Sequence, residues 1–330
     1  MTQPFVSLVI TTKNEEKNIG NCLESIRWQT YPQNLLEVIV VDNGSTDQTK
    51  QISRKYTAKV FDKGPERSSQ RNYGMRMARG KYLMYLDADM ILSPTVIEKA
   101  VEKLSPVSNI QCPRLQSPQA TAECGQAVSN IPPVALYIPE VILGNSYWSK
   151  VRRFERSFYD GTVIDCARFV KKDIFEQTGG FDLNMTGPED WDFDKKVRKI
   201  GSVEVLDKYD FEAIDKKILD IRYWILGEEG LKKLINLTKD PIIYHNEAGF
   251  NFRKYFQKKR YYSKSFSTYI NKWGKDDSDI KKQFGFWYRY FGVFLEKGKW
   301  KKIMQYPSLI IGIFLLRFLV GLSFVFSRFK

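Results

Sequence analysis

The chain has 330 residues, 43% of them hydrophobic, which suffices for one large α/β domain with an appendage or for two modest domains. Its net charge of +14 comes from the tail, because residues 251–330 contain 18 Lys/Arg and 4 Asp/Glu whereas residues 1–250 contain 34 of each. The four scattered cysteines argue against a zinc site or a disulfide framework, and the N-terminus lacks the layout of a signal peptide.

Strand and helix patterns alternate along residues 1–105. Short apolar runs predict strands at residues 5–10, 38–41, 59–61 and 82–86, and helical spacing predicts helices at 15–29, 46–56, 68–78 and 93–104. Strands that alternate with helices of this length are typical of βαβ units. We therefore predict an α/β fold with a mainly parallel central sheet flanked by helices.

The rest of the chain is less regular. Prolines break residues 106–160 into short pieces, residues 162–170 predict a further strand, and residues 171–178 and 190–200 predict helices. A last short strand is predicted at residues 242–244, before the basic and apolar tail.

Asp87 and Asp89 directly follow the strand predicted at residues 82–86. Ligands bind at the carboxyl edge of open α/β sheets. Paired carboxylates there suit Mg²⁺ or Mn²⁺, which bind proteins through one or two carboxylates plus substrate phosphates. The pair predicts a metal-dependent enzyme acting on a nucleotide diphosphate, and the alternative is an ordinary strand-end turn rich in Asp.

Three further candidates lie at the ends of predicted elements. Asp42 ends the second strand, where it can accept hydrogen bonds from a base or ribose or can shape the turn together with Ser45. Arg67 and Arg71 share one face at the start of a helix, where arginine can bind phosphate bidentately. Surface salt bridging is the alternative for both arginines.

A second acidic pair, Glu189 and Asp190, lies at the start of a predicted helix. A carboxylate there can act as a general base or as an ordinary helix cap. The next residue, Trp191, offers a flat apolar wall for a sugar ring. His245 is the only histidine, and it can be a third metal ligand, a phosphate donor or a structural hydrogen-bonding residue.

Six motifs occur in the order found in family 2 glycosyltransferases of the GT-A fold, which the chain resembles from Val6 to about Trp273. They are residues 7–15 (SLVITTKNE), 40–47 (VVDNGSTD), 70–74 (QRNYG), 78–89 (ARGKY to LDAD), 179–182 (GGFD) and 189–192 (EDWD). The resemblance implies a Rossmann-like GT-A domain.

The resemblance also implies a role for each candidate. On the donor side, Asp42 would hold the nucleobase, with Thr12 and Glu15 lining the same pocket. Arg71 would approach the ribose or the diphosphate. Asp87 would contact the ribose or a metal-bound water, and Asp89 would bind Mn²⁺ or Mg²⁺. On the other side, Asp190 would be the catalytic base, Glu189 would support the acceptor, and His245 would be a further metal or diphosphate ligand.

The reaction that the resemblance implies is a single inverting displacement. Asp190 would take the proton of an acceptor hydroxyl, and the metal would offset charge on the departing nucleotide diphosphate. Two alternatives stay open: a polyprenyl-phosphate sugar synthase, whose acceptor phosphate needs no general base, and a non-catalytic sugar-binding scaffold.

The tail predicts contact with a membrane. Residues 309–326 contain 14 strongly apolar residues and one charge, Arg317, so that insertion is favourable on an insertion scale although the stretch is at the short end of a bilayer span. Three arrangements of this segment are open: it spans the bilayer, it lies in the membrane interface, or it is buried within the domain or in a dimer interface.

We therefore expect a GT-A catalytic domain at residues 1–245, a basic aromatic helical extension at 246–302 and an apolar membrane-associating helix at 303–330. The catalytic domain is expected on the cytoplasmic face of a membrane, with a lipid-linked or envelope glycan as acceptor. Because an apolar stretch follows the basic one, lipid is favoured over nucleic acid as the partner of the tail.

Overall fold

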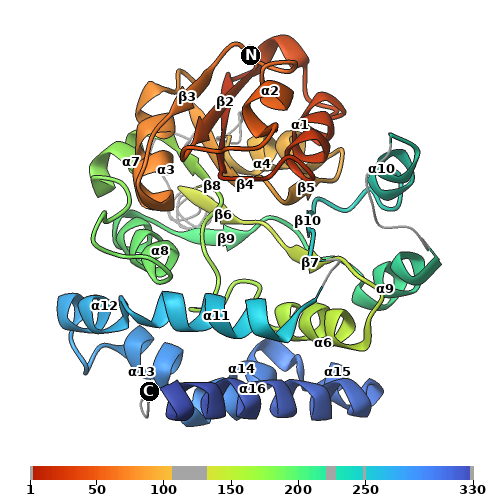
Figure 1. Ribbon diagram of the computed structural model, residues 1–330, viewed down its shortest axis with the longest axis vertical. Coiled ribbons are helices and arrows are strands. Elements are labelled where there is room, and N and C mark those ends of the chain that lie inside the picture. Colours follow the sequence, from red (N-terminus) through yellow and green to blue (C-terminus); the bar gives the residue numbers. More distant parts are fainter. Residues whose placement is uncertain (1–2, 106–131, 221–227, 248–249, 328–330) are drawn as a thin grey trace, which may run out of the picture.

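The computed structural model describes residues 3–105, 132–220, 228–247 and 250–327 (Figure 1). Its main sheet has seven strands in the order β3-β2-β1-β4-β8-β6-β9. Their bounds are β1 Val6–Thr12, β2 Leu36–Asp42, β3 Val60–Asp62, β4 Tyr82–Asp87, β6 Ala135–Tyr137, β8 Phe169–Lys171 and β9 Val203–Val205. Among these strands only β8 is antiparallel to its neighbours, so the expected mainly parallel sheet is confirmed.

Helices cover both faces of this sheet, which confirms the flanked arrangement. On one face, α1 (Ile19–Arg27) and α4 (Val96–Leu104) pack on the apolar side chains of β1 and β4 that point toward them. On the other face, α3 (Glu66–Met77), α7 (Lys172–Thr178) and α8 (Glu189–Ile200) bury the alternate side chains of the same strands. This two-sided burial explains the continuous apolar runs in the sequence.

A smaller sheet brings the strand of His245 to the second aspartate of the Asp-Ala-Asp segment. It consists of β5 (Met90–Leu92), β10 (Ile243–His245) and β7 (Glu140–Ile142), in the order β5-β10-β7. In the register of β10 and β5, His245 pairs with Met90, the residue after Asp89.

Of the remaining helices, α2 (Thr49–Ser53) packs next to α1 on the main sheet, and the others lie beside and below the sheets (Figure 1). The bounds of these others are α6 Tyr147–Arg156, α9 Phe211–Asp220, α10 Glu228–Ile235, α11 Phe252–Ser263, α12 Phe266–Trp273, α13 Ser278–Phe284, α14 Val293–Leu295, α15 Trp300–Gln305 and α16 Pro307–Ser327, with a π-helical turn at Tyr288–Gly292. Figure 1 shows α11 beneath the sheets and α16 crossing the end of the molecule opposite the N-terminus.

The strand predicted at residues 162–170 is wrong over most of its length, because only Phe169–Lys171 is extended. Turns replace it: the backbone of Thr162 donates to Tyr159 O, and the Asp165 carboxylate accepts the backbone N–H groups of Gly161 and Cys166. Residues 106–131 of the irregular middle section lie outside the described residues. Within the described ranges, we find no helix whose length and hydropathy would let it cross a membrane.

Candidate active site

A pocket of about 350 Å³ opens at the carboxyl ends of β1 and β4. Its wall comes from four parts of the chain. These are the strand ends and following loops (Thr11, Thr12, Lys13, Glu15, Asn43), α3 (Glu66, Arg67, Gln70), the Asp-Ala-Asp segment (Asp87, Ala88, Asp89), and, from later in the chain, Thr186 with Lys258, Tyr261 and Tyr262. The pocket lies at the sheet edge where the sequence places its ligand site.

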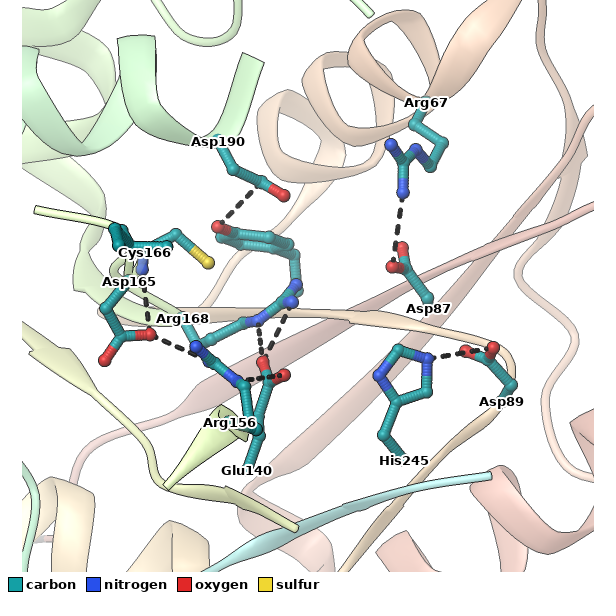
Figure 2. A network of polar contacts seen from close by, with 12 residues as sticks. Arg67, Asp87, Asp89, Glu140, Arg156, Asp165, Cys166, Arg168, Asp190 and His245 are labelled. Carbon is teal, nitrogen blue, oxygen red and sulfur yellow. Dashed lines mark hydrogen bonds and ion pairs between the residues drawn. The ribbon is translucent and has the colours of Figure 1, made fainter. Parts of the chain in front are cut away.

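Asp87 is the most strongly paired acidic group of the pocket. Its Oδ1 accepts from Arg71 at 3.0 Å and from Thr11 Oγ1 at 3.1 Å, and its Oδ2 lies 3.6 Å from Arg67. Figure 2 shows the Arg67 side chain pointing toward Asp87. Burial alone would raise the pKa of Asp87, but the two arginines hold it well below its usual range, so that the carboxylate is ionised.

Glu189 and Asp190 begin α8 and reach the same two arginines. Glu189 Oε1 lies 2.7 Å from Arg67, and Asp190 Oδ1 accepts from Arg71 at 2.7 Å. Asp190 keeps 19% of its side chain exposed whereas Glu189 keeps 1%. Burial raises the pKa of Glu189 against the opposing charge of Arg67. Asp190 is therefore the more exposed member of the pair, although the residues that line the pocket described above include neither of them.

Arg71 lies beneath the pocket and does not line it. Its side chain is fully buried, with the guanidinium 4.6 Å from the ring of Tyr85 and 5.2 Å from the ring of Phe181. We expected Arg71 to approach the ribose or the diphosphate, but its side chain is buried below the pocket wall. The Arg71 guanidinium instead bonds both Asp87 and Asp190. The alternative of a surface salt bridge does not fit either, because the bridge is buried.

A second polar network contacts Asp190 through the hydroxyl of Tyr85. Tyr85 donates from its hydroxyl to Asp190 Oδ1 at 3.2 Å, and its ring contacts the guanidinium of Arg168 at 5.0 Å. Arg168 and Arg156 both donate to Glu140, and Arg156 also pairs with Asp165, as Figure 2 shows. The position of Asp190 thus depends on buried charges in β7 and α6.

Asp89 and His245 form the other end of the site. His245 Nε2 lies 3.1 Å from Asp89 Oδ2, and the backbone N–H of Asn246 donates to Asp89 O at 2.9 Å. Burial works against the charged ring, but the Asp89 carboxylate raises the pKa of His245 to about 9. His245 is therefore protonated at neutral pH while it is paired with Asp89.

Of the acidic and histidine side chains at this site, one is suited to bind a hard divalent cation. Within the described residues, no cluster of three or more His, Cys, Asp or Glu side chains is arranged to hold a metal. Asp87 is occupied by arginines, and His245 would have to lose its proton to become a ligand. Asp89 is 24% exposed in the pocket, and one carboxylate plus substrate phosphates is a usual Mg²⁺ site. Asp89 is thus the residue that fits the ion.

The predicted nucleobase residues have different surroundings. Thr12 lines the pocket, and its buried Oγ1 has no hydrogen-bond partner among the described residues. Glu15 also lines it, and burial raises the pKa of this carboxyl, to which the charges of Asp89 and Asp87 add. Asp42 is fully buried, and its two oxygens accept from the backbone and hydroxyl of Ser45, which is the turn-shaping alternative.

Trp191 does not stand free as an apolar wall. Its indole N–H donates to Ile164 O at 3.0 Å, and its ring stacks with Phe266 and meets Phe284 edge-on. It joins α8 to the helices α12 and α13, which is a structural role.

Residues 7–179 of the chain match the glycosyl transferase family 2. The chain belongs to this family. The matched part contains Asp42, Arg71, Asp87 and Asp89, whereas Asp190 and His245 lie beyond it.

Individual relatives match either a shorter part of the chain or a longer part at lower identity. The chain is 37% identical to glycosyltransferase AglE of Haloferax volcanii over 111 residues, which cover 32% of this chain and 36% of AglE. It is 25% identical to an uncharacterized glycosyltransferase, RT0329, of Rickettsia typhi over 254 residues, which cover 73% of this chain and 74% of that protein. The match to AglE thus spans little more than a third of that relative.

Two solved structures are similar at low identity. S. aureus TarS has a TM-score of 0.41 and 18% identity, over 84% of this chain and 46% of that one. The mannosyltransferase PcManGT from Pyrobaculum calidifontis, solved in complex with GDP-Man and Mn²⁺, has a TM-score of 0.47 and 15% identity, over 100% of this chain and 82% of that one.

Three of the pocket residues that sequence reasoning missed lie on one helix of this family 2 chain. Lys258, Tyr261 and Tyr262 lie on α11, far from every motif. The Tyr262 ring lies 5.1 Å from the Arg67 guanidinium, and Tyr261 donates to Glu66. At Gly187, before α8, an added Cβ would lie 2.5 Å from Tyr262 Cβ. The glycine preceding the acidic pair was the available signal, since it marks a close approach.

Proposed function

We propose that the protein is an inverting, metal-dependent glycosyltransferase that moves a sugar from a nucleotide-diphosphate sugar to an acceptor hydroxyl. The observation that carries the proposal is the pairing of one buried guanidinium, that of Arg71, with Asp87 at 3.0 Å and with Asp190 at 2.7 Å. A donor-side carboxylate and an acceptor-side carboxylate are thereby held at a fixed separation, which is the positioning that a displacement reaction requires.

In this mechanism Asp190 is the general base. Its contacts with Arg71 and Tyr85 both use Oδ1, so Oδ2 is the atom that takes the proton of the acceptor hydroxyl. As that proton moves, the hydroxyl oxygen bonds to the anomeric carbon and the bond from that carbon to the phosphate oxygen breaks. Attack opposite the leaving group inverts the configuration, and no covalent enzyme intermediate forms.

The leaving nucleotide diphosphate carries negative charge into a pocket whose wall contains three cations, Lys13, Arg67 and Lys258. Arg67 and Lys258 line that wall from α3 and α11, and each can bind a phosphate oxygen. Asp89 would hold Mg²⁺ or Mn²⁺ together with the diphosphate, and the ion would offset charge on the leaving oxygen. Thr12 Oγ1, buried without a described partner, is left to bond the nucleoside.

We also propose that the acceptor is a lipid-linked or envelope glycan and that the catalytic domain works at the cytoplasmic face of a membrane. The basic tail with its apolar end supports this proposal. A polyprenyl-phosphate sugar synthase remains the alternative, because an acceptor phosphate attacks without a base.

The test begins with thermal shifts produced by UDP, GDP, dTDP and CMP, each with and without Mn²⁺, to name the donor class. Turnover of the corresponding sugar nucleotide is then compared between wild type, Asp190→Asn and, as a matched exposed carboxylate at the start of another helix, Asp173→Asn.

We expect kcat to fall about 10²–10⁴-fold in Asp190→Asn and to stay unchanged in Asp173→Asn. A near-normal rate in Asp190→Asn would favour the synthase. If none of the nucleotides shifts the melting temperature, the result would favour a non-catalytic scaffold.

A further inference from the structure

The outer face of α16 exposes large apolar side chains in helical register. Ile311, Leu315 and Phe318 are 66%, 45% and 58% exposed, and their spacing of four and three residues places them on one side of the helix. Soluble surfaces rarely gather such residues without a function.

The opposite side of α16 is packed on the body. Leu309, Ile313 and Leu316 repeat the same spacing and are buried in a cluster with Val151 and Phe154 of α6. An added Cβ at Gly312 would lie 2.5 Å from Val151 Cγ2, so the two helices approach closely. One side of α16 therefore belongs to the core, and its other side is exposed among the residues that the structure describes.

The single charge of α16 points inward. Arg317 bonds Glu155 of α6 at 3.0 Å and the hydroxyl of Tyr159 at 3.0 Å. Burial alone would raise the pKa of Glu155, but Arg317 and Arg152 lower it below its usual range. If α16 left the body, the buried Glu155 carboxylate would lose this partner, so the pairing holds the helix in place along α6.

The apolar surface continues from α16 onto the π-helical turn. The ring of Phe314 lies 6.2 Å from that of Phe291, which lies 5.6 Å from that of Trp287, the latter 76% exposed. We call Trp287, Phe291, Ile311, Phe314, Leu315 and Phe318 together the apolar outer face.

The segment that carries this face is basic. Residues 278–327 contain eight Lys/Arg, of which Arg317 points inward, and two acidic residues. Lys281 and Lys282 of α13, beside the π-helical turn, are 61% and 46% exposed and pair with Asp276 and Glu296. An aromatic and aliphatic surface bordered by lysines matches the interface of an anionic bilayer, where aromatic rings lie at headgroup depth and lysines meet lipid phosphates.

We propose that the apolar outer face docks onto the surface of an anionic membrane, with α16 lying parallel to the bilayer plane and still packed on α6. This orientation differs from that of a spanning helix, because Arg317 stays paired with Glu155. The proposal does not depend on the transferase chemistry, so its test uses binding alone.

The first experiment measures co-sedimentation of the full chain with vesicles of phosphatidylcholine, with or without phosphatidylglycerol. Wild type is compared with Leu315→Asp/Phe318→Asp and with the control Leu183→Asp, which places one such charge at a leucine that is 63% exposed on the catalytic body. We expect binding to the mixed vesicles, a partition coefficient lowered at least about tenfold in the double variant, and no change in the control.

Two results would overturn the proposal. One is equal binding, or no binding, for wild type and the double variant. The other is a wild type that is dimeric by light scattering without lipid, becomes monomeric in the double variant and binds no vesicle, because the face would then be covered by a second copy.

The second experiment tests the orientation with Val151→Cys/Gly312→Cys. Oxidation of this pair cross-links α16 to α6, since the close approach at Gly312 suits a disulfide. The cross-linked protein is expected to bind vesicles as the reduced protein does. Binding that is lost on oxidation and regained on reduction would mean that α16 must leave the body, and the docking orientation would be refuted.

Discussion

Replacing Arg71 by methionine tests the link between the two halves of the site. The substitution keeps a long apolar stem against Tyr85 and Phe181 but removes the guanidinium. Asp190 then loses its 2.7 Å bond, and Asp87 keeps only the more distant Arg67, at 3.6 Å, and Thr11.

The magnitude follows from the burial of these partners. Removal of one member of a buried ion pair costs about 3–5 kcal/mol. Because Asp87 and Asp190 each keep 19% exposure, water can solvate them in part, and we expect about 3 kcal/mol. For a chain of this size the melting temperature falls by about 4 °C. Asp190 is no longer oriented, so kcat falls about 10²-fold.

The assay is differential scanning calorimetry together with steady-state kinetics on the donor that the nucleotide panel identifies, at a temperature where every variant is folded. Arg71→Lys is the matched control, because it keeps the charge but cannot bond both carboxylates as a planar fork. We expect Arg71→Lys to recover part of the stability and little of kcat.

The pH profile adds a second readout. Without Arg71 the pKa of Asp87 rises toward its ordinary value, so the acid side of the activity profile moves to higher pH. An Arg71→Met enzyme with the stability, kcat and pH profile of the wild type would refute the bridging role.

Three further predictions concern other parts of the site. Lys258→Ala should raise KM for the donor about tenfold with little change in melting temperature, whereas a structural role would lower the melting temperature. Asp89→Asn should abolish the additional thermal shift that Mn²⁺ gives with nucleotide, and an unchanged shift would exclude Asp89 as the ligand. Glu140→Gln should cost about 3 kcal/mol at neutral pH. Burial raises the pKa of Glu140, but Arg156 and Arg168 lower it to about 2. The stability that it contributes is therefore present above pH 4.5 and lost as the pH falls toward 2, so denaturant titrations of the two proteins should converge in acid.

The sheet and the position of the pocket follow from local sequence. Apolar runs that end in polar residues, such as residues 82–86 before Asp87, predict both a strand and the edge at which it ends. The spacing of Arg67 and Arg71 likewise predicts a shared helix face. These features depend on residues that are neighbours in the chain, and the structure confirms the strands and the common face.

Features that depend on distant packing could not be predicted. The helical register of Arg71 does not show that Tyr85, Phe181 and Asp190 enclose it. Residues 162–168 are apolar enough for a strand, but Asp165 binds the backbone of its own turn and Arg156. Nothing in the spacing of Lys258 shows that α11 reaches the pocket, because that contact is made by the folded chain as a whole.

The placement of α11 bears on where the functional unit ends. Residues 7–179 carry the family match, and the main sheet is complete by β9, yet Lys258, Tyr261 and Tyr262 complete the pocket from beyond both limits. A chain cut at the end of the match would lack α8 with Asp190, and one cut after β10 would keep Asp190 and His245 but open one side of the pocket to solvent. Boundaries drawn from shared motifs therefore leave out part of this pocket, whose wall extends at least to α11.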